Sequence, residues 1–169
     1  MASQAAKLSG LARKLVNDKL IDKDGAEDAA QQAADKDLPL VSYLVQNDLV
    51  SANAIANSAA QEFGTPLIDL EAVDPEAIPS QIISERLIRT HHAIPLYHRG
   101  NRLFVAVSDP TNRQALADIQ FQTGISTEEV LVEEDKLSAF ISLILESEED
   151  TSFSDFGDED IDLDLESIN

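Results

Sequence analysis

The chain has no cysteine among its 169 residues, which excludes disulfides, thiolate metal sites and cysteine nucleophiles. No apolar stretch approaches the roughly 20 residues that a membrane-spanning helix needs. Residues 1–7 also lack the long apolar segment of a secretory signal peptide. These absences predict a protein of a reducing, cytoplasmic compartment.

Basic residues are scarce: 12 Lys and Arg stand against 32 Asp and Glu, for a net charge of −20. A charge of this sign argues against nucleic acid or an anionic membrane surface as a direct partner. Residues 146–169 alone contain 11 acidic and no basic residues. Because too little there can be buried to offset the entropy of ordering, residues 147–169 are predicted to be a disordered acidic tail. A linear motif that docks on a partner is the alternative.

Motifs for catalysis are also missing. The chain has no Walker A sequence, no His-Glu-x-x-His and no Gly-rich dinucleotide fingerprint. The adjacent His91 and His92 are expected to interact with helix-end carbonyls rather than with a metal. The carboxylates look scattered over helix caps and exposed faces, with no pair marked for acid–base chemistry. The sequence therefore predicts a non-enzyme with no catalytic, cofactor-binding or metal site.

Residues 63–70 (Phe-Gly-Thr-Pro-Leu-Ile-Asp-Leu) divide the chain into two parts. Gly64 can end a helix with a positive φ, and Pro66 cannot continue one. The apolar run that follows has the length of a short strand. Residues 63–70 therefore predict a hinge, with a helical subdomain at 1–62, an α/β subdomain at 63–146 and the tail beyond.

The first part contains an internal repeat with an offset of 29 residues, which aligns residues 15–21 with residues 44–50. Each copy is typical of a helix, a tight turn and a second helix, with leucines at i and i+4 on one face. Asp22 and Ser51 are suited to cap the second helices. Two related helical hairpins that pack as a small bundle are predicted.

The second part mixes helix and strand signals, so the fold class is α+β. The central strand should be the second one, because it is apolar on both faces. The last helix has the clearest amphipathic pattern, with an apolar stripe of Leu137, Phe140, Ile141, Ile144 and Leu145. The predicted elements are a helix at 80–91, strands at 93–97 and 102–107 around a Gly100-Asn101 turn, a helix from Asp109-Pro110 to Gly124, a strand at 130–132 and a helix that opens with residues 133–135.

Several motifs in order carry a family resemblance. Residues 94–96, 101–112 and 119–124, with the hinge at 63–70, resemble the N-terminal region of PilB-type type IV pilus assembly ATPases. The resemblance covers about residues 8 to 145, and type II secretion ATPases share this region. It implies a head that precedes a hexameric motor, which hydrolyses ATP to extend the pilus from the cytoplasmic face of the inner membrane. ATP and Mg²⁺ are then expected only in that motor, after Asn169, with Met1 as the native start.

The repeat is also similar to the MshEN arrangement, which binds cyclic di-GMP. There each copy opens with Arg-Leu-Gly, has a Gly before its second apolar pair and closes with Gln. Loss of the Arg removes a bidentate donor for phosphate or guanine, and new acids repel a dianion. We therefore do not expect direct nucleotide binding. The corresponding residues here are Gly10-Leu11-Ala12, Lys19 and Ala33 in the first copy, and Pro39-Leu40-Val41, Asp48 and Glu62 in the second.

The resemblance further implies regulation through a protein. We predict that a PilZ-domain adaptor, itself linked to a cyclic di-GMP receptor, docks on this region through Tyr43, Tyr97 and Phe104. The alternative for these three side chains is burial in the core. Competing functions are a cyclic di-GMP receptor domain, the equivalent head of a type II secretion ATPase, and an autonomous adaptor without a motor.

Overall fold

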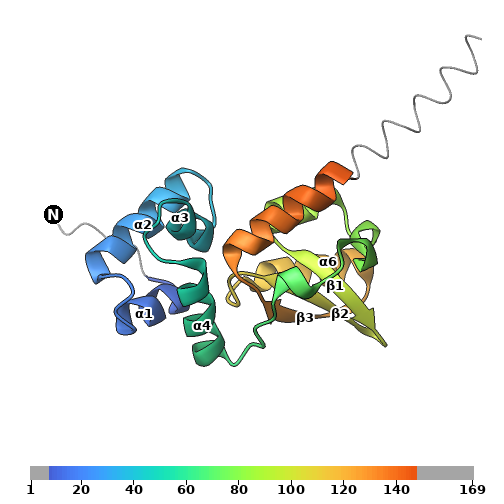
Figure 1. Cartoon of the computed structure of the whole chain (residues 1–169), viewed down its shortest axis with the longest axis horizontal. Coiled ribbons are helices and arrows are strands. Elements are labelled where there is room, and N and C mark those ends of the chain that lie inside the picture. Colours follow the sequence, from blue (N-terminus) through green and yellow to red (C-terminus); the bar gives the residue numbers. More distant parts are fainter. Residues whose placement is uncertain (1–7, 148–169) are drawn as a thin grey trace, which may run out of the picture.

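The computed structural model describes residues 8–147, apart from the side chain of Ser80. Its helices and strands form an α+β fold (Figure 1). The predicted acidic tail lies outside the described residues from residue 148 on. The elements are, in order, α1 (Gly10–Asn17), α2 (Lys23–Asp35), α3 (Leu40–Gln46), α4 (Ala52–Phe63), η1 (Leu70–Ala72), η2 (Pro75–Ala77), η3 (Ser80–Ile82), α5 (Glu85–His91), β1 (Ile94–Arg99), β2 (Arg102–Val107), α6 (Arg113–Thr123), β3 (Ser126–Leu131) and a C-terminal helix from residue 134.

Helices α1 to α4 form the two hairpins that the repeat predicts. The side chains of Asp22 and Ser51 accept hydrogen bonds from the backbone N–H groups of Gly25 and Ala54, so both predicted caps are confirmed. Helix α2 contacts α3, and α1 contacts α4, which joins the two copies into one bundle. We call α1–α4 the helical unit.

The turn inside each hairpin has the same unusual backbone geometry. Lys19 and Asp48, which are equivalent in the repeat, have φ angles of 60° and 54°. This left-handed region favours glycine, because a Cβ there crowds the backbone. Both turns therefore place a residue other than glycine in a conformation that favours glycine.

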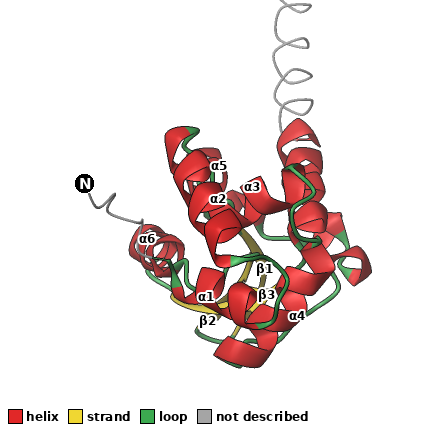
Figure 2. Cartoon of the chain, turned by 90° about the vertical axis from the view of Figure 1, so that its left-hand side faces the viewer, coloured by secondary structure: helices red, strands yellow, loops and turns green. Residues whose placement is uncertain are grey.

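Three strands form the sheet, in the order β1-β2-β3. Strand β2 is central, as predicted, and pairs antiparallel with β1 and parallel with β3. Helix α6 connects the two parallel strands. Viewed from the helical side, the helical unit lies in front of the strands (Figure 2). Residues 66–147 are called the sheet unit below.

Several element boundaries differ from those predicted, including that of β3, which begins at Ser126 rather than Val130. The helix at 80–91 is interrupted, because Ser84 caps α5 through the backbone N–H of Leu87. The helix predicted from Asp109 begins at Arg113, where the Asn112 side chain supplies the cap. The strand expected after Pro66 is reduced to one bridge, between Leu67 and Leu131.

The buried apolar residues form two clusters, one in each unit. The sheet-unit cluster includes all five residues of the predicted amphipathic stripe: Leu137, Phe140, Ile141, Ile144 and Leu145. The helical-unit cluster contains Leu11, Leu15, Leu44 and Ile55 with several alanines. It also contains Leu131 from the end of β3.

Candidate functional site: a surface groove and an aromatic pair

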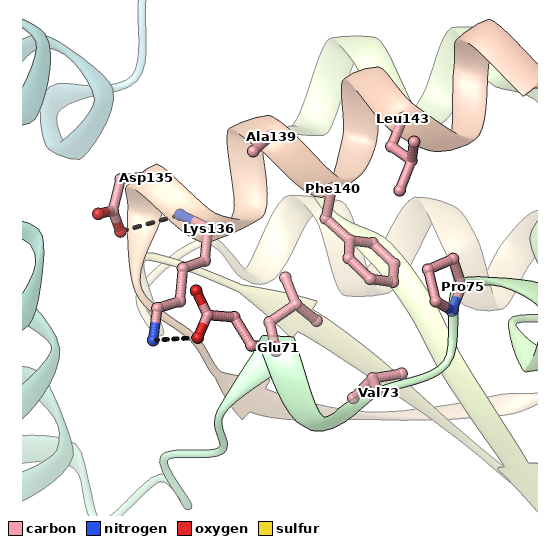
Figure 3. A pocket seen from close by; sticks show the side chains of 9 residues that line it. Glu71, Val73, Pro75, Asp135, Lys136, Ala139, Phe140 and Leu143 are labelled. Atoms are coloured by element: carbon pink, nitrogen blue, oxygen red, sulfur yellow. Dashed lines mark hydrogen bonds and ion pairs between the residues drawn. The ribbon is translucent and has the colours of Figure 1, made fainter.

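A groove of about 430 Å³ runs along the C-terminal helix. One wall comes from this helix and the other from residues 70–75, so side chains far apart in sequence face each other (Figure 3). Phe140 points across the groove towards Val73 and Pro75, and Leu143 is about half exposed beside it. The lining residues are Leu70, Glu71, Val73, Pro75, Asp135, Lys136, Ala139, Phe140 and Leu143.

Charged groups gather at one end of the groove, around Lys136. Its Nζ lies 3.2 Å from Asp69 Oδ1, 3.6 Å from Glu133 Oε1 and 3.9 Å from Glu71 Oε2. The hydrogen bond to Asp69, with the surrounding carboxylates, raises the pKa of Lys136. The backbone N–H of Glu71 and the Lys136 ammonium lower the pKa of Asp69. This end is therefore rich in carboxylates, and the rest of the groove is apolar.

The structure brings two of the three predicted partner-binding residues together. The rings of Tyr97 and Phe104 stack with centroids 4.6 Å apart on the β1–β2 hairpin. Tyr97 is 40% exposed, whereas Phe104 is half-buried against the sheet-unit cluster. Tyr43 is only 9% exposed and belongs to the helical-unit cluster, with Lys36 Nζ 5.4 Å from its ring centre. Tyr97 and Phe104 therefore form a stacked aromatic pair on the hairpin, in which Tyr97 is the more exposed ring.

Sequence analysis missed a buried carboxylate, Glu134, which is 3% exposed. Its Oε1 accepts hydrogen bonds from Ser42 Oγ at 2.7 Å and Ser138 Oγ at 3.0 Å, and lies 2.7 Å from His92 Nε2. Burial raises the pKa of Glu134, but His92, Ser108 and Ser42 together outweigh this effect and leave the pKa below its usual value. Glu134 therefore favours the ionised form.

Both histidines at the end of α5 pair with carboxylates, not with the helix-end carbonyls that sequence analysis proposed. His91 Nε2 lies 2.8 Å from Asp118 Oδ2 on α6, and His92 contacts Glu134. The expectation that the carboxylates lie on helix caps and exposed faces was also wrong for Glu134, which is buried. Within residues 8–147, no group of three His, Asp or Glu side chains is placed to hold a metal ion, and no helix is long and apolar enough to cross a membrane.

The positions that correspond to the nucleotide motif lie apart from the groove, in the helical unit. Lys19 and Asp48 occupy the two left-handed turns. Ala33 is buried in the helical-unit cluster, and Glu62 is exposed near the end of α4. The helical geometry of the repeat is therefore present, with acids at two positions where the motif has Gly or Gln.

Comparison with known sequences gives one matching family and several relatives. The family model for the MshEN domain matches residues 63–151. This match covers the sheet unit rather than the repeat, to which sequence analysis assigned the MshEN likeness. The type IV pilus assembly ATPase PilB of Pseudomonas aeruginosa is 47% identical over 148 residues, 88% of this chain and 26% of that protein. PilB of Acinetobacter baylyi is 37% identical over 95% of this chain and 27% of that protein.

The type II secretion system protein E of Xanthomonas campestris is more distant, at 31% identity over 57% of this chain and 18% of that protein. The chain thus spans about a quarter or less of the length of these curated relatives. Several solved structures share its fold. The N-terminal domain of XpsE has a TM-score of 0.63 at 21% identity, over 78% of this chain and 91% of that one. MshE with cdg has a TM-score of 0.57 at 24% identity, over 80% of this chain and 99% of that one.

Proposed function

Since this chain belongs to the MshEN domain family and matches the N-terminal region of PilB-type ATPases, we propose that it is the regulatory, protein-docking head of a type IV pilus extension motor. In this proposal the head catalyses nothing. ATP and Mg²⁺ bind a hexameric motor domain elsewhere in the full-length protein, at the cytoplasmic face of the inner membrane. The identity to PilB over 88% of the chain is the observation that carries the proposal.

The partner in this proposal is a PilZ-domain adaptor, through which a cyclic di-GMP receptor acts on the motor. The stacked Tyr97–Phe104 pair is the proposed anchor, because an exposed aromatic side chain held rigidly by its neighbour loses little entropy on binding. Tyr43 is buried and would act indirectly, by supporting α3. A stacked aromatic pair with Tyr97 exposed on a hairpin supports a protein contact more than a small-molecule site.

Titration of the full chain with a purified PilZ-domain protein tests this footprint. We expect Tyr97→Ser to weaken the complex about tenfold or more, as loss of an interface anchor does. Phe121→Ser is the matched control, because Phe121 is a 93% exposed aromatic on α6 outside the proposed footprint. Equal affinities of both variants for the PilZ-domain protein would reject the hairpin as the binding site. A loss of affinity with Leu143→Ser alone would place the binding site in the groove instead.

Direct binding of cyclic di-GMP is the second candidate, and the two left-handed turns at Lys19 and Asp48 favour it. MshE, which has the same fold, was solved with cdg. Two acidic residues of the second copy, Asp48 and Glu62, argue against this candidate, because they would repel a dianion. Saturable heat on titration with cyclic di-GMP would support this candidate. No heat, with binding of the PilZ-domain protein, would support the adaptor.

The head of a type II secretion ATPase is a further alternative. The greater identity to PilB, 47% against 31%, favours the pilus motor. Complementation of a pilB deletion by the full-length gene separates the two, since a secretion ATPase would not restore pili.

A further inference from the structure

The end of β3 places neighbouring side chains in different cores. Val130 and Val132 belong to the sheet-unit cluster, whereas Leu131, between them, is fully buried in the helical-unit cluster. This follows from the strand geometry, in which successive side chains point to opposite faces. Leu131 is therefore an apolar anchor that the sheet unit inserts into the helical unit.

Polar contacts between the units end on the residues just after this anchor. Ser42 Oγ on α3 donates to Glu134 Oε1 at 2.7 Å, across 92 residues of sequence. Asn53 Nδ2 on α4 donates to Glu133 Oε1 at 3.4 Å. Residues 131–134, which we call the junction segment, thus contact both helices of the second hairpin, α3 and α4.

Glu134 also has polar contacts within the sheet unit. His92, at the end of α5, and Ser138, one turn along the C-terminal helix, contact the same Oε1 atom that accepts from Ser42. His92 also has a left-handed backbone, with a φ of 50°. A buried carboxylate that joins α3, α5 and the C-terminal helix is costly to leave unpaired, so it favours one arrangement of the three.

We propose that the junction segment sets the orientation of the helical unit on the sheet unit, and that the Ser42–Glu134 and Asn53–Glu133 hydrogen bonds together fix this orientation. Loss of either bond frees the helical unit to rotate about the Leu131 anchor, while each unit stays folded. The groove begins at Asp135, the residue after the segment. A partner in the groove therefore lies next to the contact that fixes the helical unit.

Distance measurements between spin labels test the proposal, and the absence of cysteine makes labelling direct. Labels at Asp28→Cys on α2 and Phe121→Cys on α6 report the relative placement of the units, because both positions are exposed. We expect a narrow distance distribution in the parent chain and a broader or shifted one with Ser42→Ala. Amide exchange in α3 should become about tenfold faster, as expected for loss of a hydrogen bond to a charged group.

The matched control is Ser138→Ala, which removes a hydrogen bond to the same carboxylate without crossing between the units. It should leave the distribution unchanged. Equal distributions in the parent and Ser42→Ala, or equal broadening in both variants, would overturn the proposal. Should Ser42→Ala fail to fold, Asn53→Ala decides, because Asn53 is exposed and its bond ends on Glu133. Broadening with Asn53→Ala then supports the proposal, and an unchanged distribution contradicts it.

Discussion

The helical unit and the sheet unit differ in what fills their cores. Three of the eleven described residues in the buried cluster of the helical unit are alanines (Ala29, Ala33 and Ala59), against three of twenty in that of the sheet unit. Alanine buries little apolar area, so it stabilises less per residue. The helical unit also uses Leu131 from the sheet unit, whereas the described sheet-unit cluster contains no buried residue before Leu70. For the apolar clusters, the dependence between the units is therefore one-way.

The largest expected effect follows from removing this shared side chain. Leu131→Ala should lower the free energy of unfolding by about 2–5 kcal/mol, the range for truncating a fully buried leucine. Amides of α1–α4 should lose protection from hydrogen exchange more than those of β1 and β2. Val130→Ala is the control, since Val130 packs only in the sheet-unit cluster. Equal loss of protection in both units with Leu131→Ala would contradict the one-way dependence.

Acid should weaken the contact between the units. The pKa of Glu134 in the folded protein is below its usual value, so its contribution is present above the unfolded pKa of about 4.3 and is lost as the pH falls through the folded pKa. Urea unfolding at neutral and acidic pH measures this loss. In Glu134→Gln the decline below that pH should be smaller than in the parent chain. A decline of the same size in both would remove Glu134 as its cause.

The equivalent caps of the repeat should contribute similar free energies. Asp22→Ala and Ser51→Ala each remove a side-chain acceptor from a helix N-terminus, which costs about 1 kcal/mol. Asn57→Ala, within α4, is the control and should change the free energy of unfolding by less than either cap. Thermal and urea unfolding of the three variants provide the comparison. Unequal cap effects would show that the two hairpins are not equivalent in energy.

A smaller gain is expected at the left-handed turns. Lys19→Gly and Asp48→Gly should each raise the free energy of unfolding by about 0.5–1 kcal/mol, because glycine adopts positive φ without strain. The gain should be larger at Lys19, since Asp tolerates this region better than Lys. Asn47→Gly is the control, at an ordinary φ of −98°, and should not stabilise. Stabilisation by all three would mean that relief of strain is not the cause.

The helical unit was the more predictable of the two from sequence. Its 29-residue repeat, its caps at Asp22 and Ser51, and the end of α4 at Gly64 depend on local signals, and the structure confirms them. Local patterns also identified β2 as the central strand. These features depend on residues a few positions apart, which a sequence shows directly.

Predictions that depended on distant partners were less successful. Helix α6 begins at Arg113 rather than Asp109, and its cap residue Asn112 also donates to the carbonyl of His91, 21 residues earlier. Strand β3 begins at Ser126, before the predicted Val130, because pairing with β2 extends over its polar half. Glu134 is predicted only as one of the residues that open the last helix, although its partner Ser42 lies 92 residues away. No pattern among neighbouring residues in the sequence indicates such long-range contacts.

The most direct test of the proposed head is calorimetry of the full chain with two ligands in separate titrations: a PilZ-domain protein and cyclic di-GMP. We expect saturable heat with the protein and none with the nucleotide, since acids stand at positions 48 and 62 of the nucleotide pattern. Saturable heat with cyclic di-GMP and none with the PilZ-domain protein would contradict the proposed function.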